Sequence, residues 1–497
     1  MSNIGLVIAI LLLMLSLMAI RMPIAFALGL SGGVGIVLLR SFENATSTIG
    51  SVPFTQVASF SLAIIPMFTL MGMFAVKARI AEQVYQVAAF VFRKFPGGLG
   101  VATVMACAGF AAVSGSSIGT AATMSKLSVT EMRKHGYPLP LATATVAVAG
   151  TLGVLIPPSV ILVLYAIMTG ESVGQVLAAG IIPGILSAGA YATYVVFAAR
   201  RTMVRNPGIA SEVAEELQDE LDRELEELED APALATALAN VSGSAPGATA
   251  DIASHEVQGR RIQEALVVEK PAERLRDLPM RGVIRVAVLF VIVLGGMYSG
   301  LFTPTESAAI GAVVAGAMLV AEMWKEGPKA IWIASVDALK ETAGTTSMVF
   351  SIIVGSAILS SFFVLARVPR MLADGVMSWG LSPTLTMIIL LATLLPLGMI
   401  LETISILVIT VPLIYPVAME FGFSGVWLAI IFVKLIEIGM VTPPVGINCF
   451  VVAGTAGVKV DRVFAGVLPF VIVDMIVIAI LFAFPDIVLW LPSLVQV

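Results

Sequence analysis

Two short stretches of the sequence place a glycine four residues before a pair of prolines, inside otherwise apolar segments. They are "GTLGVLIPPS" (150–159), with Gly153, and "IEIGMVTPPV" (436–445), with Gly439. Proline has no N–H, so the carbonyl groups that a helix would pair with the proline positions lose their partners. Such oxygens suit a small hard cation, and the N-termini of half-helices suit an anion. We expect two broken helices that line a site; two proline kinks that serve packing alone are the alternative.

A second interruption, rich in hydroxyl groups, precedes each proline pair. "GFAAVSGSSIGTAATMSKLS" (109–128) holds its polar residues between apolar arms too short to span a bilayer, and "LETIS" (401–405) lies at the centre of 384–419. Small residues at a tip let the backbone approach a ligand, and hydroxyl oxygens suit a hard cation. We predict two re-entrant hairpins. An ordinary helix contact rich in Ser and Gly is the alternative.

Charged residues within apolar segments suggest function, because they are costly in a membrane. Lys434 and Glu437 lie three residues apart on one predicted helix, so we interpret them first as a structural ion pair and second as a contact for substrate or ion. Glu402 has no basic residue nearby in the sequence. Asp474 is expected at the membrane interface.

Catalytic chemistry has little support in the sequence. The two histidines, His135 and His255, lie in a basic turn and in an acidic segment, so no histidine is available for a metal site or a Ser-His pair within the membrane. No P-loop pattern occurs. An intramembrane acid pair made by Glu402 and Glu437 remains a minor alternative, and we predict that the protein is not an enzyme.

The composition is that of a polytopic membrane protein. Of the 497 residues 58% are hydrophobic and 12% charged, and the mean hydropathy is +1.01. Runs such as 4–20 and 471–491 are long enough to cross a bilayer as helices, and the first is expected to be a retained span. Cys107 and Cys449 are predicted to be lone buried thiols.

One segment differs from the rest in charge. Residues 206–277 contain 17 acidic and 6 basic residues, a net charge of −11, which leaves +6 for the remainder of the chain. We expect a soluble insertion with a charged helix followed by a linker of small residues. Four leucines fall on one face of that helix, which suits a partner or a short coiled coil, although a solvated arm is an equal alternative: Leu217, Leu221, Leu225 and Leu228.

Basic residues predict the orientation of the spans. Cytoplasmic placement of the basic clusters puts the N-terminus outside and the acidic insertion inside. After the insertion we expect spans at 284–301, 306–323 and about 340–365, with Arg367 and Arg370 outside against the rule. The clusters assigned to the cytoplasm are Arg21, Lys77, Arg79, Arg93, Lys94, Arg133, Lys134, Arg200, Arg201, Arg205, Arg274, Arg276, Arg281, Arg285, Lys325, Lys329, Lys459 and Arg462.

The two halves of the chain resemble each other at an offset of 286 residues. Nine of 48 positions match without a gap, and six of the nine are Gly or Pro, whose backbone requirements are hard to meet by accident. With opposite starting sides, this predicts an inverted repeat, which is typical of secondary transporters. The matches are Gly136, Gly153, Pro157, Pro158, Ile161, Thr169, Ala179, Gly180 and Pro183 with Gly422, Gly439, Pro443, Pro444, Ile447, Thr455, Ala465, Gly466 and Pro469.

Together these motifs resemble the large membrane subunit of tripartite ATP-independent periplasmic (TRAP) transporters. The resemblance rests on "SGSSIGTAA" with "GTLGVLIPPS", on "GLFTPTESAAIGAV", and on "LETISILVIT" with "EIGMVTPPVGINCF". It covers the chain outside 206–277, an insertion longer than the family leads us to expect. It implies a sodium-driven importer of organic acids in a bacterial inner membrane, with paired re-entrant hairpins and an elevator-type fold. It also implies two partners, a separate small four-helix membrane subunit and a periplasmic binding protein that delivers substrate.

From the repeated breaks we assign Na⁺, the ion that the resemblance implies, to two pseudo-equivalent positions. The substrate, a carboxylate such as a C4-dicarboxylate or sialic acid, is assigned to the space between the hairpin tips. The sodium positions use Ser114, Gly115, Ser116, Thr151, Gly153 and Pro157, and Glu402, Thr403, Ser405, Gly439, Thr442 and Pro443. The substrate residues are Ser116, Ser117, Thr403 and Asn448.

The predicted organisation has a scaffold, a mobile transport part and the insertion. The scaffold and arms take 1–97 and 284–382, the transport part takes 98–199 and about 383–475 within the last region, 383–497, and the insertion takes 206–277. Membrane lipid surrounds the spans, and no basic patch with aromatic residues suggests nucleic acid. The alternatives are a stand-alone sodium/dicarboxylate symporter and, remotely, a membrane enzyme or lipid-handling protein.

Overall fold

The chain forms helices throughout the part that its structure describes. A computed structural model describes residues 3–20, 22–95, 97–205, 278–377 and 380–495, and no strand occurs within them. Seven of these helices are long and apolar enough to cross a bilayer, and one bent pair adds an eighth if it is counted as a single span. The predicted all-α polytopic membrane fold is confirmed. The predicted acidic insertion, 206–277, lies outside the described residues.

The first half has six helical segments before its hairpin. They are α1 (Asn3–Ala19), α2 (Ile24–Leu39), α3 (Phe42–Val57), η1 (Phe60–Ala63), α4 (Ile64–Lys77) and α5 (Ile80–Phe92). The hairpin, the broken helix and a long final helix follow. They comprise α6 (Gly98–Ser114), α7 (Ser117–Met124), η2 (Ser125–Val129), α8 (Thr130–Lys134), α9 (Leu139–Gly150), α10 (Leu152–Leu155), α11 (Val160–Thr169) and α12 (Val173–Arg205).

The second half has the same plan. Its leading helices are α15 (Met280–Phe290), η4 (Val291–Gly295), α16 (Gly296–Tyr298), α17 (Pro304–Met323), η5 (Trp324–Glu326), α18 (Pro328–Leu365) and α19 (Val368–Met377). The hairpin, the broken helix and the final helices are α20 (Pro383–Ala392), α21 (Leu394–Gly398), α22 (Thr403–Glu420), α23 (Gly425–Val441), α24 (Ile447–Ala456), α25 (Val460–Ala483) and α26 (Asp486–Leu494).

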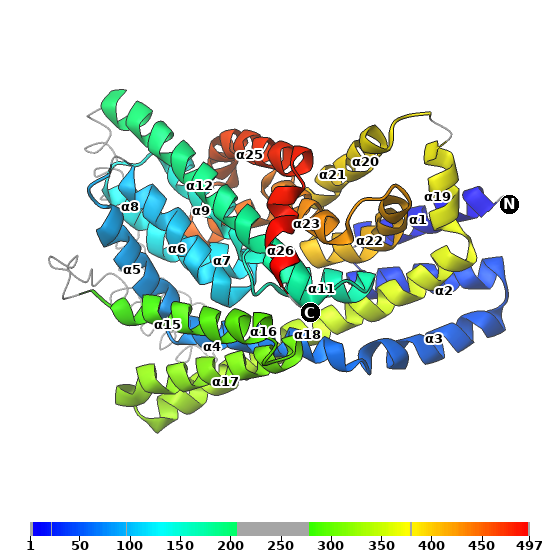
Figure 1. Cartoon of the computed structure of the whole chain (residues 1–497), viewed down its shortest axis with the longest axis horizontal. Coiled ribbons are helices and arrows are strands. Elements are labelled where there is room, and N and C mark those ends of the chain that lie inside the picture. The colour runs from blue at the N-terminus through cyan, green and yellow to red at the C-terminus, as the bar shows by residue number, and fades with distance from the viewer. Residues whose placement is uncertain (1–2, 21, 96, 206–277, 378–379, 496–497) are drawn as a thin grey trace, which may run out of the picture.

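Helix boundaries repeat at the offset found in the sequence. Helices α7 and α22 begin at Ser117 and Thr403, and α9 and α23 begin at Leu139 and Gly425, in both cases 286 residues apart. The turns that precede α9 and α23 contain equivalent glycines with φ of 77° and 79°, a left-handed conformation that favours glycine. Figure 1 shows the hairpin α6–α7 on the side of α8 and α5, and α20–α22 on the side of α19 and the N-terminus. The predicted inverted repeat is therefore present.

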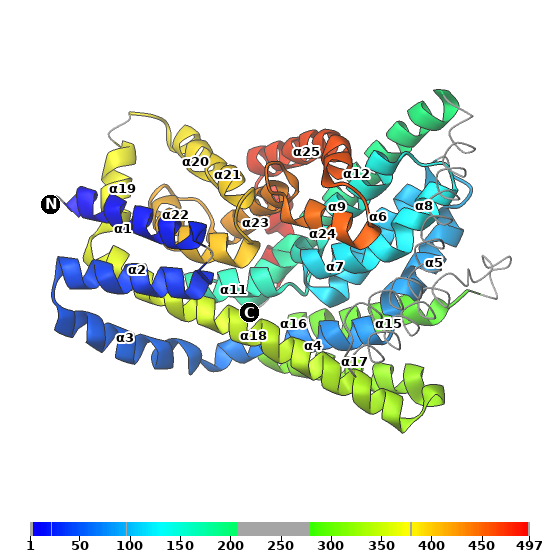
Figure 2. The same cartoon turned by 180° about the vertical axis from the view of Figure 1, so that it is seen from behind.

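The helices before the two hairpins pack together along one edge of the molecule. Long helix α18 lies against α2, α3 and α4, and α17 lies against α4, as both views show (Figures 1 and 2). The contact between α2 and α18 is close, because a Cβ on Gly32 would lie 2.6 Å from the backbone of Leu359. Such small-residue contacts are typical of helices that pack in lipid.

The two halves interlock in the rest of the molecule. Helix α25 of the second half packs on α9 of the first, and α12 of the first packs on α23 of the second. Each hairpin also reaches the opposite half, since α7 contacts α24 and α22 contacts α11. Segments of both repeats therefore enclose one shared interior.

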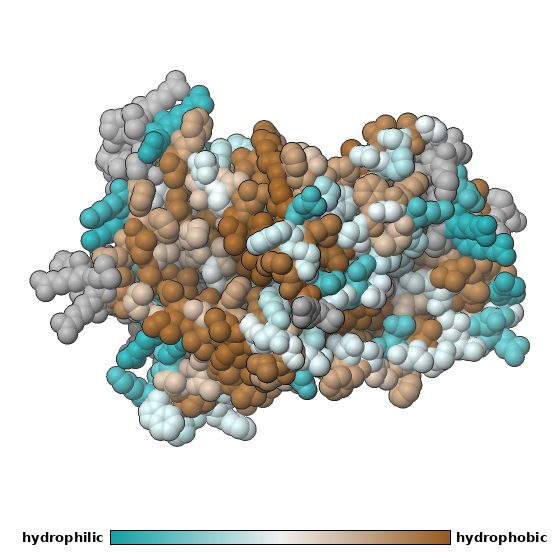
Figure 3. All heavy atoms as spheres, viewed as in Figure 1, coloured by the Kyte–Doolittle hydropathy of each residue, from teal (hydrophilic) through white to brown (hydrophobic). Residues whose placement is uncertain are grey.

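Polar and apolar side chains separate on the surface. Hydrophobic residues cover much of the middle of the face in Figure 3, and hydrophilic residues gather mainly toward its two ends. The basic helix α8 and the carboxyl end of α12 lie at the end opposite the N-terminus (Figure 1). Two of the basic segments predicted to be cytoplasmic therefore lie at the same end of the molecule.

Two expected spans differ from the structure in length. The run 471–491 is not one helix, because α25 ends at Ala483 and α26 begins after Pro485, which cannot donate the hydrogen bond that continues a helix. The span expected at about 340–365 starts earlier, at Pro328, and α18 has 38 residues. The lone cysteines Cys107 and Cys449 are free and buried, as predicted.

Candidate functional site

The first broken helix is held against the tip of the first hairpin. Helices α9–α10 and α11 meet at an angle of 42°. A Cβ on Gly153 would lie 2.7 Å from the carbonyl oxygen of Ser116, so only glycine allows this approach. Pro157 is buried and has no N–H to donate to the carbonyl of Gly153. The predicted break and its contact with the tip are both observed.

The second broken helix also has a glycine in close contact with its hairpin, but its prolines are more exposed than those of the first. A Cβ on Gly439 would lie 2.5 Å from the Cα of Gly398 at the end of the first arm of the second hairpin. The peptide bond within each Pro-Pro pair is cis. Pro443, unlike its buried first-half equivalent, is exposed. The Gly439 carbonyl accepts a bond from the Thr442 N–H at 3.0 Å, so the expectation that it lacks a partner is wrong.

Hydroxyl groups crowd the tip of the first hairpin. The hydroxyls of Ser114 and Thr120 lie 2.7 Å apart, and Gly115 ends α6 with a φ of 60°. Ser116 caps α7 by accepting a hydrogen bond from a backbone N–H three residues later. Ser117, the first residue of α7, is buried. Four predicted site residues are thus placed at one turn.

The tip of the second hairpin carries a carboxyl group in the equivalent place. Glu402 precedes α22, and its Oε1 atom is buried without a hydrogen-bond partner among the described residues. The buried hydroxyl of Ser405 lies near this carboxyl group. Thr403, the first residue of α22, points to the second broken helix.

The two tips converge on Glu437. The Thr403 hydroxyl donates a hydrogen bond of 2.9 Å to Oε1 of Glu437, and the Ser117 side chain lies near this carboxylate. Thr403 and Ser117 are equivalent residues of the two repeats, and Glu437 is equivalent to Thr151. Glu437 is 2% exposed, and its Oε2 atom has no hydrogen-bond partner in the described chain. This buried carboxylate of the second broken helix is therefore hydrogen-bonded to one hairpin tip and lies near the other.

Asn448 is a further buried polar residue at the second break. It lies on the first turn of α24 and is 0% exposed. Neither Nδ2 nor Oδ1 has a hydrogen-bond partner among the described residues. A buried amide without partners is costly, so a bound polar group would satisfy it.

The predicted ion pair between Lys434 and Glu437 is wrong. Lys434 pairs with Asp474. Asp474 is 3% exposed, so the prediction that it lies at the membrane interface is also wrong. Both errors have one cause: α25 packs beside α23, and this tertiary contact brings two distant residues together. Glu437 is left free to face the hairpin tips.

Glu437 is not among the site residues predicted from the sequence, where it was first interpreted as half of an ion pair. The sequence repeat points to this residue, because the offset of 286 residues places Glu437 opposite Thr151, which is predicted to lie at the first sodium position. The hydroxyl of Thr151 donates to the Val148 carbonyl at 2.6 Å and that of Thr442 to the Ile438 carbonyl at 2.6 Å. Both retain lone pairs for a cation. The candidate ligands are oxygen atoms, which suit hard cations.

A family model matches nearly the whole chain. It is described as "Tripartite ATP-independent periplasmic transporter, DctM component", and it matches residues 11–487. The C4-dicarboxylate TRAP transporter large permease protein DctM of Vibrio cholerae is 30% identical over 97% of this chain and 97% of its own length. The sialic acid TRAP transporter large permease protein SiaM of the same species is 26% identical, with 97% of each chain covered.

Two further similarities concern a longer relative and a solved structure. The isethionate TRAP transporter permease protein DctMQ of Oleidesulfovibrio alaskensis is 28% identical over 93% of this chain but only 62% of that protein. The crystal structure of the Alcanivorax borkumensis YdaH transporter, described as having an unusual topology, matches with a TM-score of 0.55. It covers 89% of each chain at 12% identity, so it supports the fold alone.

Proposed function

Because the chain belongs to the DctM component family of tripartite ATP-independent periplasmic transporters, we propose that it is the large membrane subunit of a sodium-driven importer of an organic acid. The relatives are named transport permeases, so the chain is a transporter and not an enzyme. The observation that carries the proposal is the convergence of both hairpin tips on Glu437, beside two broken helices.

Sodium is proposed to bind at two positions, one in each repeat. The first uses the tip 114–117 and the backbone of 151–157, and the second uses the tip 402–405 and the backbone of 439–443. In the second, Glu437 joins the residues expected from the sequence. Its buried Oε2 atom lacks a partner and would be compensated by a cation. Oxygen ligands of this kind are those that hard cations take in proteins.

The substrate is proposed to be an anion with a carboxylate, such as a C4-dicarboxylate or sialic acid. Relatives carry the names of both substrates. Helices α7 and α22 begin at the tips, so their N-terminal N–H groups face the space proposed for the substrate carboxylate. Asn448 would supply an amide to the same space, since both its polar atoms lack partners among the described residues.

Two partners and a location complete the proposal. The family is described as a tripartite transporter, and this chain covers only 62% of the relative named permease protein DctMQ. We propose a small membrane subunit and a periplasmic binding protein as partners, in a bacterial inner membrane. A stand-alone sodium/dicarboxylate symporter is the alternative, and it would need no binding protein.

Transport is proposed to follow an elevator mechanism, in which 98–199 and 383–475 move against the remaining helices. The boundary can be tested at Val84 of α5 and Gly109 of α6, because a Cβ on Gly109 would lie 3.4 Å from the Val84 side chain. Cysteines at these two positions, with Cys107 and Cys449 changed to alanine, should stop uptake when they are oxidised. Undiminished uptake after complete cross-linking would contradict this division.

The deciding experiment is uptake of radiolabelled organic acids into proteoliposomes that contain the chain and its small subunit. The assay is run with and without an inward sodium gradient, and with and without a candidate binding protein. Uptake that requires both supports the proposal. Uptake that needs sodium but no binding protein favours the symporter, and sodium-independent uptake contradicts the coupling.

A further inference from the structure

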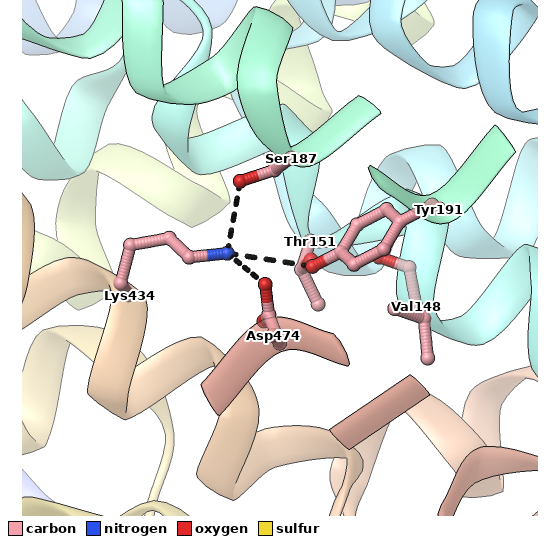
Figure 4. Close-up of polar contacts among 6 residues, drawn as sticks. All are labelled: Val148, Thr151, Ser187, Tyr191, Lys434 and Asp474. Carbon is pink, nitrogen blue, oxygen red and sulfur yellow. Dashed lines mark hydrogen bonds and ion pairs between the residues drawn. The ribbon is translucent and has the colours of Figure 1, made fainter. Parts of the chain in front are cut away.

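A buried polar cluster lies behind the two broken helices. The Lys434 ammonium group forms an ion pair with Asp474 and donates to the hydroxyls of Ser187 at 3.1 Å and Tyr191 at 3.4 Å (Figure 4). All four residues are at most 3% exposed. They come from α23, α25 and α12, so the cluster joins a helix of the first repeat to two helices of the second.

The charges of this cluster occur in only one of the two repeats. At the offset of 286 residues, Lys434 corresponds to Val148 and Asp474 to Ala188. The equivalent crossing in the first repeat is therefore built from apolar side chains. Since buried charges are expensive and apolar replacements usually pack as well, the repeat fold does not require an ion pair here. A role outside folding explains its presence better.

One residue of the cluster lies beside the first proposed sodium position, and another lies one helical turn from the second. The Tyr191 hydroxyl accepts a hydrogen bond from Lys434 and lies beside the Thr151 side chain at the first break (Figure 4). On the other side, Lys434 lies three residues before Glu437, which is one helical turn of α23. A continuous path of side chains therefore leads from Thr151 through Tyr191 and Lys434 to the helix that carries Glu437.

We infer that the Lys434–Asp474 pair, through Tyr191, is a positioning device that couples the occupancy of the two cation positions. The inference rests on the sodium-driven function proposed above. A cation that orders the backbone around Thr151 also fixes the position of the Tyr191 hydroxyl. The Lys434–Asp474 pair then holds α23 so that Glu437 is directed toward the hairpin tips. Binding at one position thereby prepares the other, which is positive cooperativity.

The test compares two tyrosines on the same helix. Tyr191→Phe removes the hydroxyl that joins Lys434 to Thr151 but keeps the ring against Phe470. Tyr194→Phe is the matched control, because Tyr194 also packs on Phe470, with centroids 4.5 Å apart. Sodium titrations of uptake give the Hill coefficient and the half-maximal sodium concentration, and substrate titrations at saturating sodium give KM.

We expect wild-type protein and Tyr194→Phe to share a Hill coefficient above one. Tyr191→Phe should lower it toward one and raise the half-maximal sodium concentration several-fold, with KM at saturating sodium changed less than twofold. The double variant Lys434→Met/Asp474→Leu removes the pair as a unit and should change the sodium titration in the same way. A purely structural role would lower the amount of inserted protein or the maximal rate and leave the sodium titration unchanged.

The outcomes separate this inference from the proposed function. If wild-type uptake depends on sodium and Tyr191→Phe keeps its Hill coefficient and half-maximal concentration, the coupling role is overturned while the proposed function stands. If wild-type uptake is independent of sodium, the proposed function fails and the coupling role fails with it. The conclusion does not depend on whether the double variant folds, because Tyr191→Phe keeps the ion pair.

Discussion

At the scale of single residues, Glu437 is the centre of the proposed site. A carboxylate buried in a membrane protein is costly unless hydrogen bonds or a cation compensate it. In the described structure the Thr403 hydroxyl donates a hydrogen bond to one oxygen atom of Glu437, and the other oxygen atom has no partner. The sodium ion proposed to bind here would supply the positive charge that this oxygen atom lacks.

Thr403→Val should weaken sodium binding while preserving the packing of α22. A hydrogen bond to a charged group contributes about 1.5–3 kcal/mol, so the half-maximal sodium concentration for uptake should rise by roughly tenfold or more. Sodium titration of uptake in proteoliposomes measures this change. Thr410→Val is the control, because Thr410 is buried on the same helix and donates only to the Ile406 carbonyl at 2.6 Å. An unchanged titration for Thr403→Val would remove Thr403 from the site.

Lys434→Met alone should be far more damaging than replacement of the whole pair. It leaves the Asp474 carboxylate buried without its cation, and breaking a buried pair costs about 3–5 kcal/mol. Adding Asp474→Leu removes the unpaired charge and should recover most of the loss. Thermal unfolding in detergent compares the three proteins. A single variant as stable as the wild type would show that the pair contributes little to stability.

At the scale of elements, the two broken helices share a plan but differ in their surroundings. The first break is buried within the chain, whereas Pro443 and Pro444 of the second are exposed. Each break lies where a glycine meets the backbone of its own hairpin. Close backbone contact therefore fixes the position of each hairpin more strictly than side-chain packing would.

Gly153→Ala should displace the first hairpin. Its Cβ would lie 2.7 Å from the Ser116 carbonyl oxygen, which is backbone and cannot rotate away. We expect a loss of stability of about 1–3 kcal/mol from overpacking and a strong reduction of uptake. Gly189→Ala on α12 is the matched control, since apart from its chain neighbours and its own helix backbone nothing in the described structure lies within 4 Å of its Cβ position, and the change should be neutral or slightly stabilising. Equal uptake by both variants would refute the close contact.

At the scale of the whole molecule, the two repeats depend on each other. The Tyr165 hydroxyl donates to the Gly425 carbonyl at 2.9 Å, and Lys434 donates to Ser187, so polar contacts link the halves inside the shared interior. The packing of α25 on α9 and of α12 on α23 adds broad apolar contacts. Neither half can bury these surfaces alone.

A chain divided within 206–277 should therefore reassemble. The fragments 1–205 and 278–497 retain every helix that the structure describes, and their interlocking faces supply the contacts that hold them together. We expect an affinity tag on one fragment to recover the other after co-expression, with uptake restored in proteoliposomes. Expression of each fragment with an unrelated membrane protein is the control. Fragments that do not co-purify would contradict interlocking as the main source of stability.

The sequence alone was sufficient to predict the spans, the helix breaks and the hairpin tips, because each of these features is caused by a few neighbouring residues. Apolar length predicts spans, Gly-Pro spacing predicts breaks in helices, and hydroxyl-rich interruptions predict hairpin tips. Helices α7 and α22 start at Ser117 and Thr403, within the predicted tips. The repeat also followed from sequence, because glycine and proline place the same backbone demands on both halves.

The partners of the buried charges depended on tertiary structure. Lys434 and Glu437 share a helix, so their spacing favoured an ion pair between them. Because α25 packs beside α23, Lys434 forms its ion pair with Asp474 instead. Glu437 instead accepts a hydrogen bond from Thr403 at the tip of the second hairpin. Sequence thus determined which segments break and where polar atoms lie along them, because those are properties of a few neighbouring residues. Only the fold decided which of those atoms meet, because long-range packing of helices sets the distances between residues far apart in the chain.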